Sequence, residues 1–273
     1  NRGPAMAVFA ALPMTPADWA MASALILVGS TLQAATGVGL GLIAGPILVL
    51  TLGGGAAIFI AIMLNLALSL MLLPQESGDV LWPEFRLLAL ATIIGVPLGW
   101  LILQQLTPLT LKWVAGIMVL LAALQLLATR FRGNADPGPD GAQGNRLVLL
   151  GGGLVSGLMC GCLAIPGPAG LWAALQSRMP PLAIPATLRA LFAFSYAGAA
   201  LIHFGLEGFD GIADKPWLET MVLLPAVVLG LVLGLLLRRR VDEGTLRTVL
   251  YLLLFAIGVS MLWRSWLEMP GNV

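Results

Sequence analysis

The stretch TGVGLGLIAGP, residues 36–46, places four glycines and a proline between two strongly apolar segments. Its Gly39-x-Gly41-x-x-Ala44 spacing matches the loose form of a dinucleotide-binding turn. Such a turn follows a strand and is followed by an acidic residue about 20 positions later, whereas the next acidic residue here is Glu76. The match to a nucleotide motif is therefore accidental, and the glycines serve a backbone in apolar surroundings.

The composition of the whole chain predicts a membrane protein. Of its 273 residues, 59% are hydrophobic and 10% are charged, and the mean hydropathy is +0.97. A soluble domain carries about 25% charged residues, so this chain has too little polar surface to cover a globule in water. Apolar runs long enough to cross a bilayer as helices recur from end to end. We expect an all-α polytopic membrane protein with lipid around it, and the formal charge of +1 gives no support for a nucleic-acid partner.

Ten apolar segments are separated by turn signals, five on each side of one long polar linker. They lie at about 18–36, 39–52, 56–73, 86–106, 109–129, 147–163, 166–177, 183–204, 218–237 and 245–267. The second and seventh are short and follow Gly or Pro closely. The predicted organisation is an N-terminal tail 1–17 (with 1–5, before Met6, interpreted as an expression remnant), a first transmembrane repeat 18–129, a cytoplasmic linker 130–146, a second transmembrane repeat 147–267 and a C-terminal tail 268–273.

The two halves share small-residue patterns in the same order. Gly39, Gly45 and Pro46 recur 122 positions later as Gly161, Gly167 and Pro168. Gly95 and Gly99 recur 135 positions later as Gly230 and Gly234. Each match is weak alone because glycine is common in this chain. Their consistent order predicts an internal duplication.

The placement of arginines predicts how the halves are inserted. The linker 130–146 and the turn at 238–247 are both rich in arginine, and such loops favour the cytoplasmic side. An even number of membrane crossings must then separate the two loops. Four apolar segments lie between them. The two short segments around Cys160 and Pro168 therefore either both span the membrane or fold together as a hairpin. Each half has an odd number of crossings, which predicts two inverted repeats, the plan of many secondary transporters.

The Gly-Pro interruptions at matching places in two inverted halves are the best sequence indication of a transport site. A helix that begins inside the membrane exposes backbone N–H groups and the positive end of its dipole. Two such helix ends at one cavity would bind a small anion. Metals and cofactors are not expected, since Cys160 and Cys162 lack further ligands at suitable spacing and are interpreted as packing residues.

Arg189 is the most informative single side chain. It lies in an apolar helix, where a buried charge is costly and usually functional, and a guanidinium matches oxyanions through paired hydrogen bonds. Its counterpart in the first half is Asn65, with Ser69 one turn away on the same face. Gln33, Thr36 and Ser156 could add neutral donors or simply join helices. His203, the chain's one histidine, is either interfacial or a proton relay.

Taken together, these patterns resemble the sulfite exporter TauE/SafE family of small-anion transporters. Each half starts with a glycine-rich stretch running into a proline, GVGLGLIAGPILVL and CGCLAIPGPAGLWAAL. Each continues with a helix of polar centre, IMLNLALSL and PATLRALFAF, and closes with a small-residue helix and a final one. The resemblance covers about 18–267. It implies transport of sulfite or a small organosulfonate such as sulfoacetate across a bacterial inner membrane.

The resemblance also implies which residues line the substrate path. Carried over by position, the predicted substrate-binding residues are Gly37, Gly39, Gly41, Gly45, Pro46, Asn65, Ser69, Gly161, Gly167, Pro168, Thr187 and Arg189. No Walker A motif is present, so an ion gradient or the gradient of the substrate itself would drive alternating-access transport.

Three alternatives stay open at this point. The chain could be a channel or an accessory subunit, or it could carry another small anion such as a carboxylate. An intramembrane enzyme is disfavoured because the acidic residues of the apolar segments, Asp18 and Glu219, lie at the very start of their segments and the histidine ends one. The sequence leaves open whether H⁺ or Na⁺ is the coupling ion and whether the protein forms a homodimer.

Overall fold

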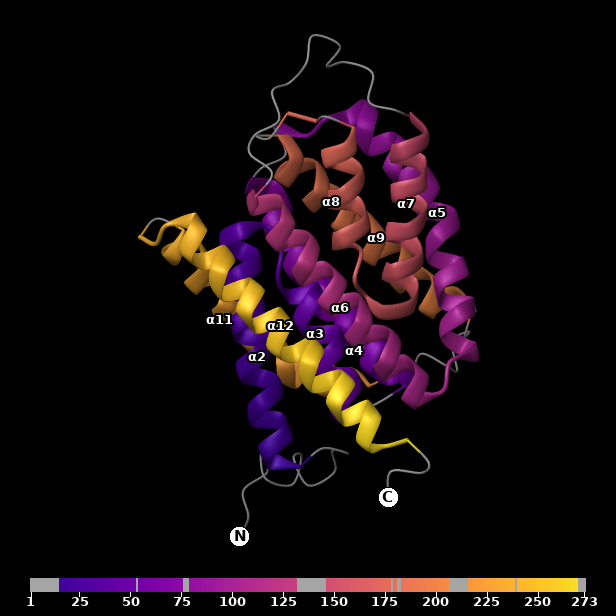
Figure 1. The fold of residues 1–273 in the computed structure, drawn as a ribbon, viewed down its shortest axis with the longest axis vertical. Helices are drawn as coiled ribbons and strands as arrows, with labels where there is room; N and C mark the ends of the chain where they lie inside the picture. Colours follow the sequence, from indigo (N-terminus) through magenta and orange to yellow (C-terminus); the bar gives the residue numbers. More distant parts are fainter. Residues whose placement is uncertain are drawn as a thin grey trace.

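The computed structural model describes residues 15–52, 54–75, 79–131, 146–177, 179–180, 183–206, 216–238 and 240–269. This part of the chain is a bundle of helices with no strand (Figure 1). The helices are α2 (Pro16–Thr36), α3 (Leu40–Thr51), α4 (Gly54–Leu72), α5 (Trp82–Gln105), α6 (Pro108–Phe131), α7 (Arg146–Leu163), α8 (Gly167–Gln176), α9 (Ala183–Leu206), α11 (Trp217–Leu237) and α12 (Glu243–Leu267), with a 3₁₀ turn η1 at Leu73–Gln75.

Eight of the described helices, all except α3 and α8, are long and apolar enough to cross a bilayer. Their outward faces are apolar too. Leu147, Leu201 and Leu252 are each more than 60% exposed, and many other large apolar side chains on the same helices are also exposed. A soluble monomer exposes no apolar surface so continuous. The expected all-α polytopic membrane class is confirmed.

The two short helices fold back along the long helices that precede them. A Cβ at Gly29 in α2 would lie 3.3 Å from Ile43 and from Leu40 in α3. In the second half, Gly152 near the start of α7 lies against Ala173 near the end of α8. Each short helix is therefore the second arm of a helical hairpin, an arrangement that both of the alternatives left by the arginine placement allow.

The two sequence halves are interleaved rather than separate bodies. The three most extensive helix contacts all join one half to the other: α5 with α7, α2 with α11, and α6 with α12. Figure 1 shows α5 and α7 running side by side at one flank of the bundle and α2 with α11 at the other. These pairings are reciprocal, because the fourth helix of each half packs on the first helix of the other. An inverted duplication requires this reciprocity, although the duplication itself stays a prediction.

Glycines bring α5 and α7 into backbone contact. A Cβ at Gly157 in α7 would lie 2.8 Å from the carbonyl oxygen of Thr92 in α5 and 3.1 Å from the Cα of Gly95. The Thr92 hydroxyl also donates a hydrogen bond of 3.0 Å to the carbonyl oxygen of Gly153. Small residues that allow this approach are the usual means of association for helices in lipid, where no hydrophobic force draws them together.

The α2–α11 pair uses the equivalent glycines. Gly230 lies against Ser30 and the carbonyl oxygen of Leu27, and Gly234 lies against the carbonyl oxygen of Thr31. Gly95 and Gly99 in α5, and Gly230 and Gly234 in α11, were matched by sequence alone. Both pairs line an interface with the other half.

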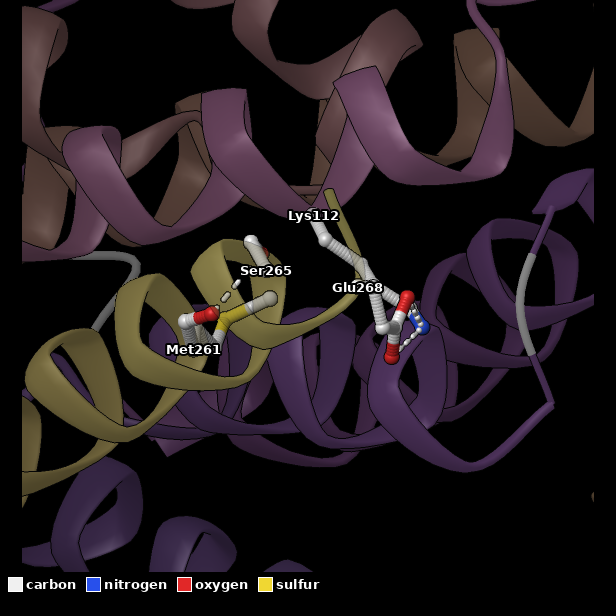
Figure 2. Close-up of polar contacts among 4 residues, drawn as sticks. All are labelled: Lys112, Met261, Ser265 and Glu268. Atoms are coloured by element: carbon white, nitrogen blue, oxygen red, sulfur yellow. Dashed lines mark hydrogen bonds and ion pairs between the residues drawn. The ribbon is translucent and has the colours of Figure 1, made fainter. Parts of the chain in front are cut away.

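An ion pair joins α6 and α12 at one end of their interface. Lys112 Nζ lies 2.7 Å from both carboxylate oxygens of Glu268 (Figure 2). Close by on α12, the Ser265 hydroxyl donates to the carbonyl oxygen of Met261, one turn earlier. Glu268 is half exposed, so the pair contributes at most about 1 kcal/mol. It fixes the pairing of helix ends more than it stabilises the bundle.

Replacing Gly157 by leucine should destabilise the bundle, because no side chain fits between α7 and the α5 backbone. Overpacking of this kind costs about 1–3 kcal/mol, so we expect a clearly lower melting temperature in detergent. Gly151→Leu on the same helix is the matched control, since a Cβ there meets nothing within 4 Å. Equal melting temperatures for the two variants would contradict the packing account.

Candidate substrate site

The two helix breaks meet at one place inside the bundle. The first lies between α2 and α3, where Gly37 has φ +88° and donates its N–H to the carbonyl oxygen of Gln33 at 2.8 Å. The second lies between α7 and α8, where Ala164 has φ +58°. A Cβ at Gly41 would lie 3.3 Å from the carbonyl oxygen of Ala164, and one at Gly45 would lie 2.7 Å from that of Leu163. The start of α3 therefore packs directly on the second break.

A small hollow of about 10 Å³, which is room for about one water molecule, lies between the breaks. One wall comes from the first break and the start of α3, the second from the second break and the start of α8, and the third from α9. The lining residues are Gln33, Val38, Gly39, Gly41, Leu42, Ile165, Pro166, Gly167, Phe192 and Tyr196. The walls thus combine apolar surface with a few polar groups.

Both short helices present their N-termini to this pocket. The N-terminus of a helix carries partial positive charge and N–H groups without partners inside the helix. The two ends are unequal in donors, because α8 starts Pro166–Gly167–Pro168 and proline has no N–H. The α3 end, with Leu40 and Gly41, is therefore the better source of backbone donors for an anion.

The Arg189 guanidinium lies against the first break. A Cβ at Gly37 would lie 3.1 Å from Nη2 of Arg189 and 3.3 Å from Nε. The arginine is 8% exposed and comes from the second half of the chain, whereas Gly37 comes from the first. Since Val38 and Gly39 line the pocket, the charge of Arg189 lies at its edge.

Asn65 and Tyr196 reach the pocket wall at Gly41. A Cβ at Gly41 would meet the Tyr196 hydroxyl and would lie 3.3 Å from Oδ1 of Asn65. The Tyr196 hydroxyl donates to the carbonyl oxygen of Ala164 at 3.2 Å. Asn65 donates from Nδ2 to the carbonyl oxygen of Ala61 at 2.8 Å, and its Oδ1 has no partner. The break residues and the polar centre of α4 are therefore neighbours, as the sequence predicted.

Ser69 lies further along the same face of α4. It is buried, and its hydroxyl has no partner. The helices α4 and α9 are antiparallel neighbours, because Asn65 approaches Tyr196 while Phe59 contacts His203. Moving along α4 from Phe59 through Asn65 to Ser69 therefore means moving along α9 from His203 towards Arg189.

The Gly45–Pro46 pair is not a helix break, contrary to the expectation. Pro46 lies inside α3, and the chain reverses eight residues earlier, around Val38. The reason is that Gly37 can adopt positive φ, so the turn forms there, while Gly45 is used for close approach to Leu163. In the second half, Gly167 and Pro168 do begin α8. The sequence match therefore paired residues at different structural positions.

Three other predicted site residues do not line the pocket. Gly161 lies inside α7 and packs on the carbonyl oxygen of Val96 in α5. The carbonyl oxygen of Pro168 accepts a hydrogen bond from Gln125 at 2.8 Å. Thr187 accepts from the backbone N–H of Leu81 at 3.1 Å and so holds the start of α5. All three join helices to one another in this structure.

Of the three neutral donors predicted from the sequence, one lines the pocket and two do not. Gln33 lines the pocket. Thr36 donates to the carbonyl oxygens of Leu32 and Val38 at 2.8 and 3.0 Å. Ser156 donates to that of Pro166 at 2.7 Å. The two hydroxyls therefore satisfy backbone carbonyls at the breaks rather than facing the pocket.

His203 is buried inside the bundle near the end of α9. It is 3% exposed and makes an edge contact with Phe59, with ring centroids 5.8 Å apart. Phe204 and Trp217 stack beside it, 5.7 Å between centroids. An aromatic cluster thus occupies the bundle two turns beyond Tyr196.

Tyr196 and Phe192 are pocket residues that the sequence analysis missed. Tyr196 follows Arg189 by seven positions, a spacing that puts both on one helix face. It is also one of two tyrosines in the chain. A search for polar residues on the Arg189 face would have found it, whereas Phe192 is not distinguishable from ordinary core residues.

Eight bilayer-length helices with apolar outward faces define a multi-pass membrane protein, and two helix N-termini and an arginine lie beside the small hollow at its centre. Residues 21–261 match the model of the family described as "Sulfite exporter TauE/SafE", and the chain belongs to this family. It is accordingly a transport protein and not an enzyme.

A relative in another bacterium agrees with this assignment. The "Probable sulfite/organosulfonate exporter TauE" of Cupriavidus necator is 24% identical over 245 residues, covering 88% of this chain and 91% of the relative. No solved structure matches the chain.

Replacing Gly37 by alanine should disturb the site through Arg189. The new methyl group would press on the guanidinium, and positive φ would be strained as well. Gly54→Ala is the matched control, because Gly54 has φ +61° but a Cβ there meets nothing within 4 Å. We expect Gly37→Ala to weaken anion binding at least about fivefold, equivalent to about 1 kcal/mol, and Gly54→Ala to leave it unchanged. Equal anion affinities in the two variants would contradict the assignment of Arg189 to the site.

Proposed function

We propose that this protein is a secondary transporter that moves a small sulfur oxyanion or organosulfonate, such as sulfite or a sulfonate, across the bacterial inner membrane by alternating access. The observation that carries the proposal is the convergence of both helix breaks, their N-termini and Arg189 on one buried pocket. The name of the Cupriavidus relative supports the choice of a sulfur anion.

In this proposal Arg189 supplies the charge that balances the anion. Its fork of N–H donors suits the oxygens of a sulfite or sulfonate group. The backbone N–H groups of Leu40 and Gly41 and the hydroxyls of Ser69 and Tyr196 add neutral hydrogen bonds. Gly37 and Gly39 contribute by shape, since their lack of side chains leaves room for the guanidinium and the pocket.

Alternating access fits the way the halves are interleaved. The pocket lies between elements of both halves, and the reciprocal α5–α7 and α2–α11 contacts are what two inverted repeats would make. Interfaces built from glycines and backbone can slide with little side-chain repacking. Rocking of one half against the other would then open the pocket to alternate sides.

Binding measurements on Arg189 variants test the proposal. Purified protein is titrated with sulfite, a sulfonate panel, sulfate and short carboxylates. We expect Arg189→Ala to weaken sulfur-anion binding about 100-fold, because hydrogen bonds to charged groups contribute about 1.5–3 kcal/mol. Arg189→Lys should restore it only in part, since a lysine lacks the fork. Arg264→Ala removes an exposed arginine near the end of α12 and is the control.

Other outcomes would favour the alternatives. An unchanged affinity for the sulfur anion in Arg189→Ala would contradict the assignment of Arg189 to the site. Preference for carboxylates would redirect the substrate class, and uptake into vesicles that fails to saturate would indicate a channel.

We further propose that His203 relays protons if H⁺ is the coupling ion. It is a buried titratable group on the same face of α9 as Arg189 and Tyr196, at seven-residue spacing. His203→Gln should then abolish the stimulation of uptake by an imposed pH gradient while retaining binding of the anion. Undiminished stimulation in that variant would exclude the relay.

A further inference from the structure

Three oxygen atoms from three separate elements surround one point beside Gly41. A Cβ at this glycine would meet the Tyr196 hydroxyl and would lie 3.3 Å from both the carbonyl oxygen of Ala164 and Oδ1 of Asn65. The Tyr196 hydroxyl lies 3.2 Å from the Ala164 oxygen. Gly41 and Tyr196 also line the small hollow between the breaks. The oxygens therefore gather at the wall of a space that one water molecule or one small ion would fill.

This group of atoms has more lone pairs than hydrogens. Asn65 is 0% exposed, and its Nδ2 donates to the carbonyl oxygen of Ala61 at 2.8 Å. A flipped amide would place two oxygens against each other at Ala61, so Oδ1 is the atom that faces Gly41. Oδ1 has no partner, because the hydrogen of the Tyr196 hydroxyl is given to Ala164. A buried acceptor without a donor in a folded protein calls for a bound group.

The end of α7 makes the same place electronegative. Ala164 directly follows Leu163, the last residue of α7. The C-terminal end of a helix carries partial negative charge and carbonyl oxygens without partners inside the helix. Secondary transporters use such carbonyl oxygens at the ends of interrupted helices to coordinate Na⁺. The group beside Gly41 thus combines two kinds of neutral ligand with a favourable helix end.

From the unpartnered Asn65 oxygen and its two neighbours we infer that Oδ1 of Asn65, the carbonyl oxygen of Ala164 and the hydroxyl oxygen of Tyr196 form a Na⁺ site. Hard cations bind neutral carbonyl and hydroxyl oxygens. Among the described residues that line the hollow none carries a carboxylate, which favours a monovalent ion over Ca²⁺ or Mg²⁺. Oxygens 3.2 Å apart suit the smaller Na⁺ better than K⁺. This inference rests on the proposed function and names the coupling ion of that transporter.

An ion at this site would be coupled to the anion. Once Na⁺ binds the Ala164 oxygen, the Tyr196 hydroxyl no longer donates there, and its hydrogen is free to turn towards an anion in the pocket. The positive charge of Na⁺ also attracts that anion. Because binding free energies are linked, each ligand must raise the affinity for the other by the same factor.

Anion binding in three media tests the site on the purified full-length protein. Sulfoacetate and sulfite are titrated in Na⁺, K⁺ and N-methylglucamine media of equal pH and ionic strength. We expect the affinity of the wild type for the anion to be at least about fivefold higher in Na⁺ than in the other two media. Saturating sulfoacetate should raise the affinity for radioactive sodium by the same factor. Equal anion affinities in the three media would overturn the inference and would leave only a water molecule in the hollow.

Two variants assign the effect of Na⁺ to these residues. Asn65→Leu keeps a similar volume without the oxygen, and Tyr196→Phe keeps the ring without the hydroxyl. In each, the ratio of anion affinities between Na⁺ and N-methylglucamine media should fall below about twofold, because one ligand of the ion is lost. Ser195→Ala is the control with a retained ratio, since Ser195 is buried, donates to Leu191 one turn earlier and lies outside the hollow. A retained ratio in both Asn65→Leu and Tyr196→Phe would overturn the assignment.

The wild-type titrations decide even if neither variant folds, and they separate this inference from the proposed function. If the anion bound equally in all three media and Arg189→Ala weakened that binding, the Na⁺ site would fail and the proposed function would stand. If neither anion bound in any medium, the proposed function itself would fail.

Discussion

The structure depends on one constraint, which is that a helix broken inside an apolar bundle must find partners for its peptide groups within the protein. This chain contains two such breaks; the hydrogen bonds described at each come from its own half, and the start of α3 packs across onto the second break. Gly41 and Gly45 of α3 pack on the carbonyl oxygens of Ala164 and Leu163, and the Tyr196 hydroxyl holds Ala164 in place. The same arrangement leaves two helix N-termini facing a common pocket. The backbone geometry that folds the bundle is thus also the geometry on which the proposed anion site depends.

The glycines have two separate purposes that the sequence alone does not distinguish. Gly37 allows positive φ at a turn, whereas Gly95, Gly99, Gly157, Gly230 and Gly234 allow helix backbones to touch. The first purpose builds the site, and the second sets how the halves meet. A substrate held between two halves that meet along smooth backbone interfaces is the arrangement that alternating access requires.

The fold class could be predicted because hydropathy and segment length report directly on the surrounding solvent. Arg189 and Asn65 could be singled out as well, since polar groups are conspicuous in apolar helices, and both lie buried beside the residues of the first break and the start of α3. The position of the first break could not, because Gly45–Pro46 resembles a break as strongly as Gly37–Gly39 does. Only the packing of α3 on α2 and on the second break decides between them.

Thr187 and Gly161 show the limit of carrying residues over from a resemblance. Both occupy the expected helices, yet one holds the start of α5 and the other packs on Val96. Tyr196 shows the reverse, because a residue without any motif becomes central when seven-residue spacing brings it onto the Arg189 face. Contacts between segments far apart in the chain decide which polar residues form a site, and these contacts require the fold.

A structure determined with 2-bromoethanesulfonate at saturating concentration tests the central claim most directly, because anomalous scattering locates the bromine without a model of the ligand. The account predicts one bromine peak in the pocket between Gly39–Leu42 and Ile165–Gly167, with the sulfonate towards Arg189. A peak elsewhere in the bundle, with this pocket empty, would contradict it.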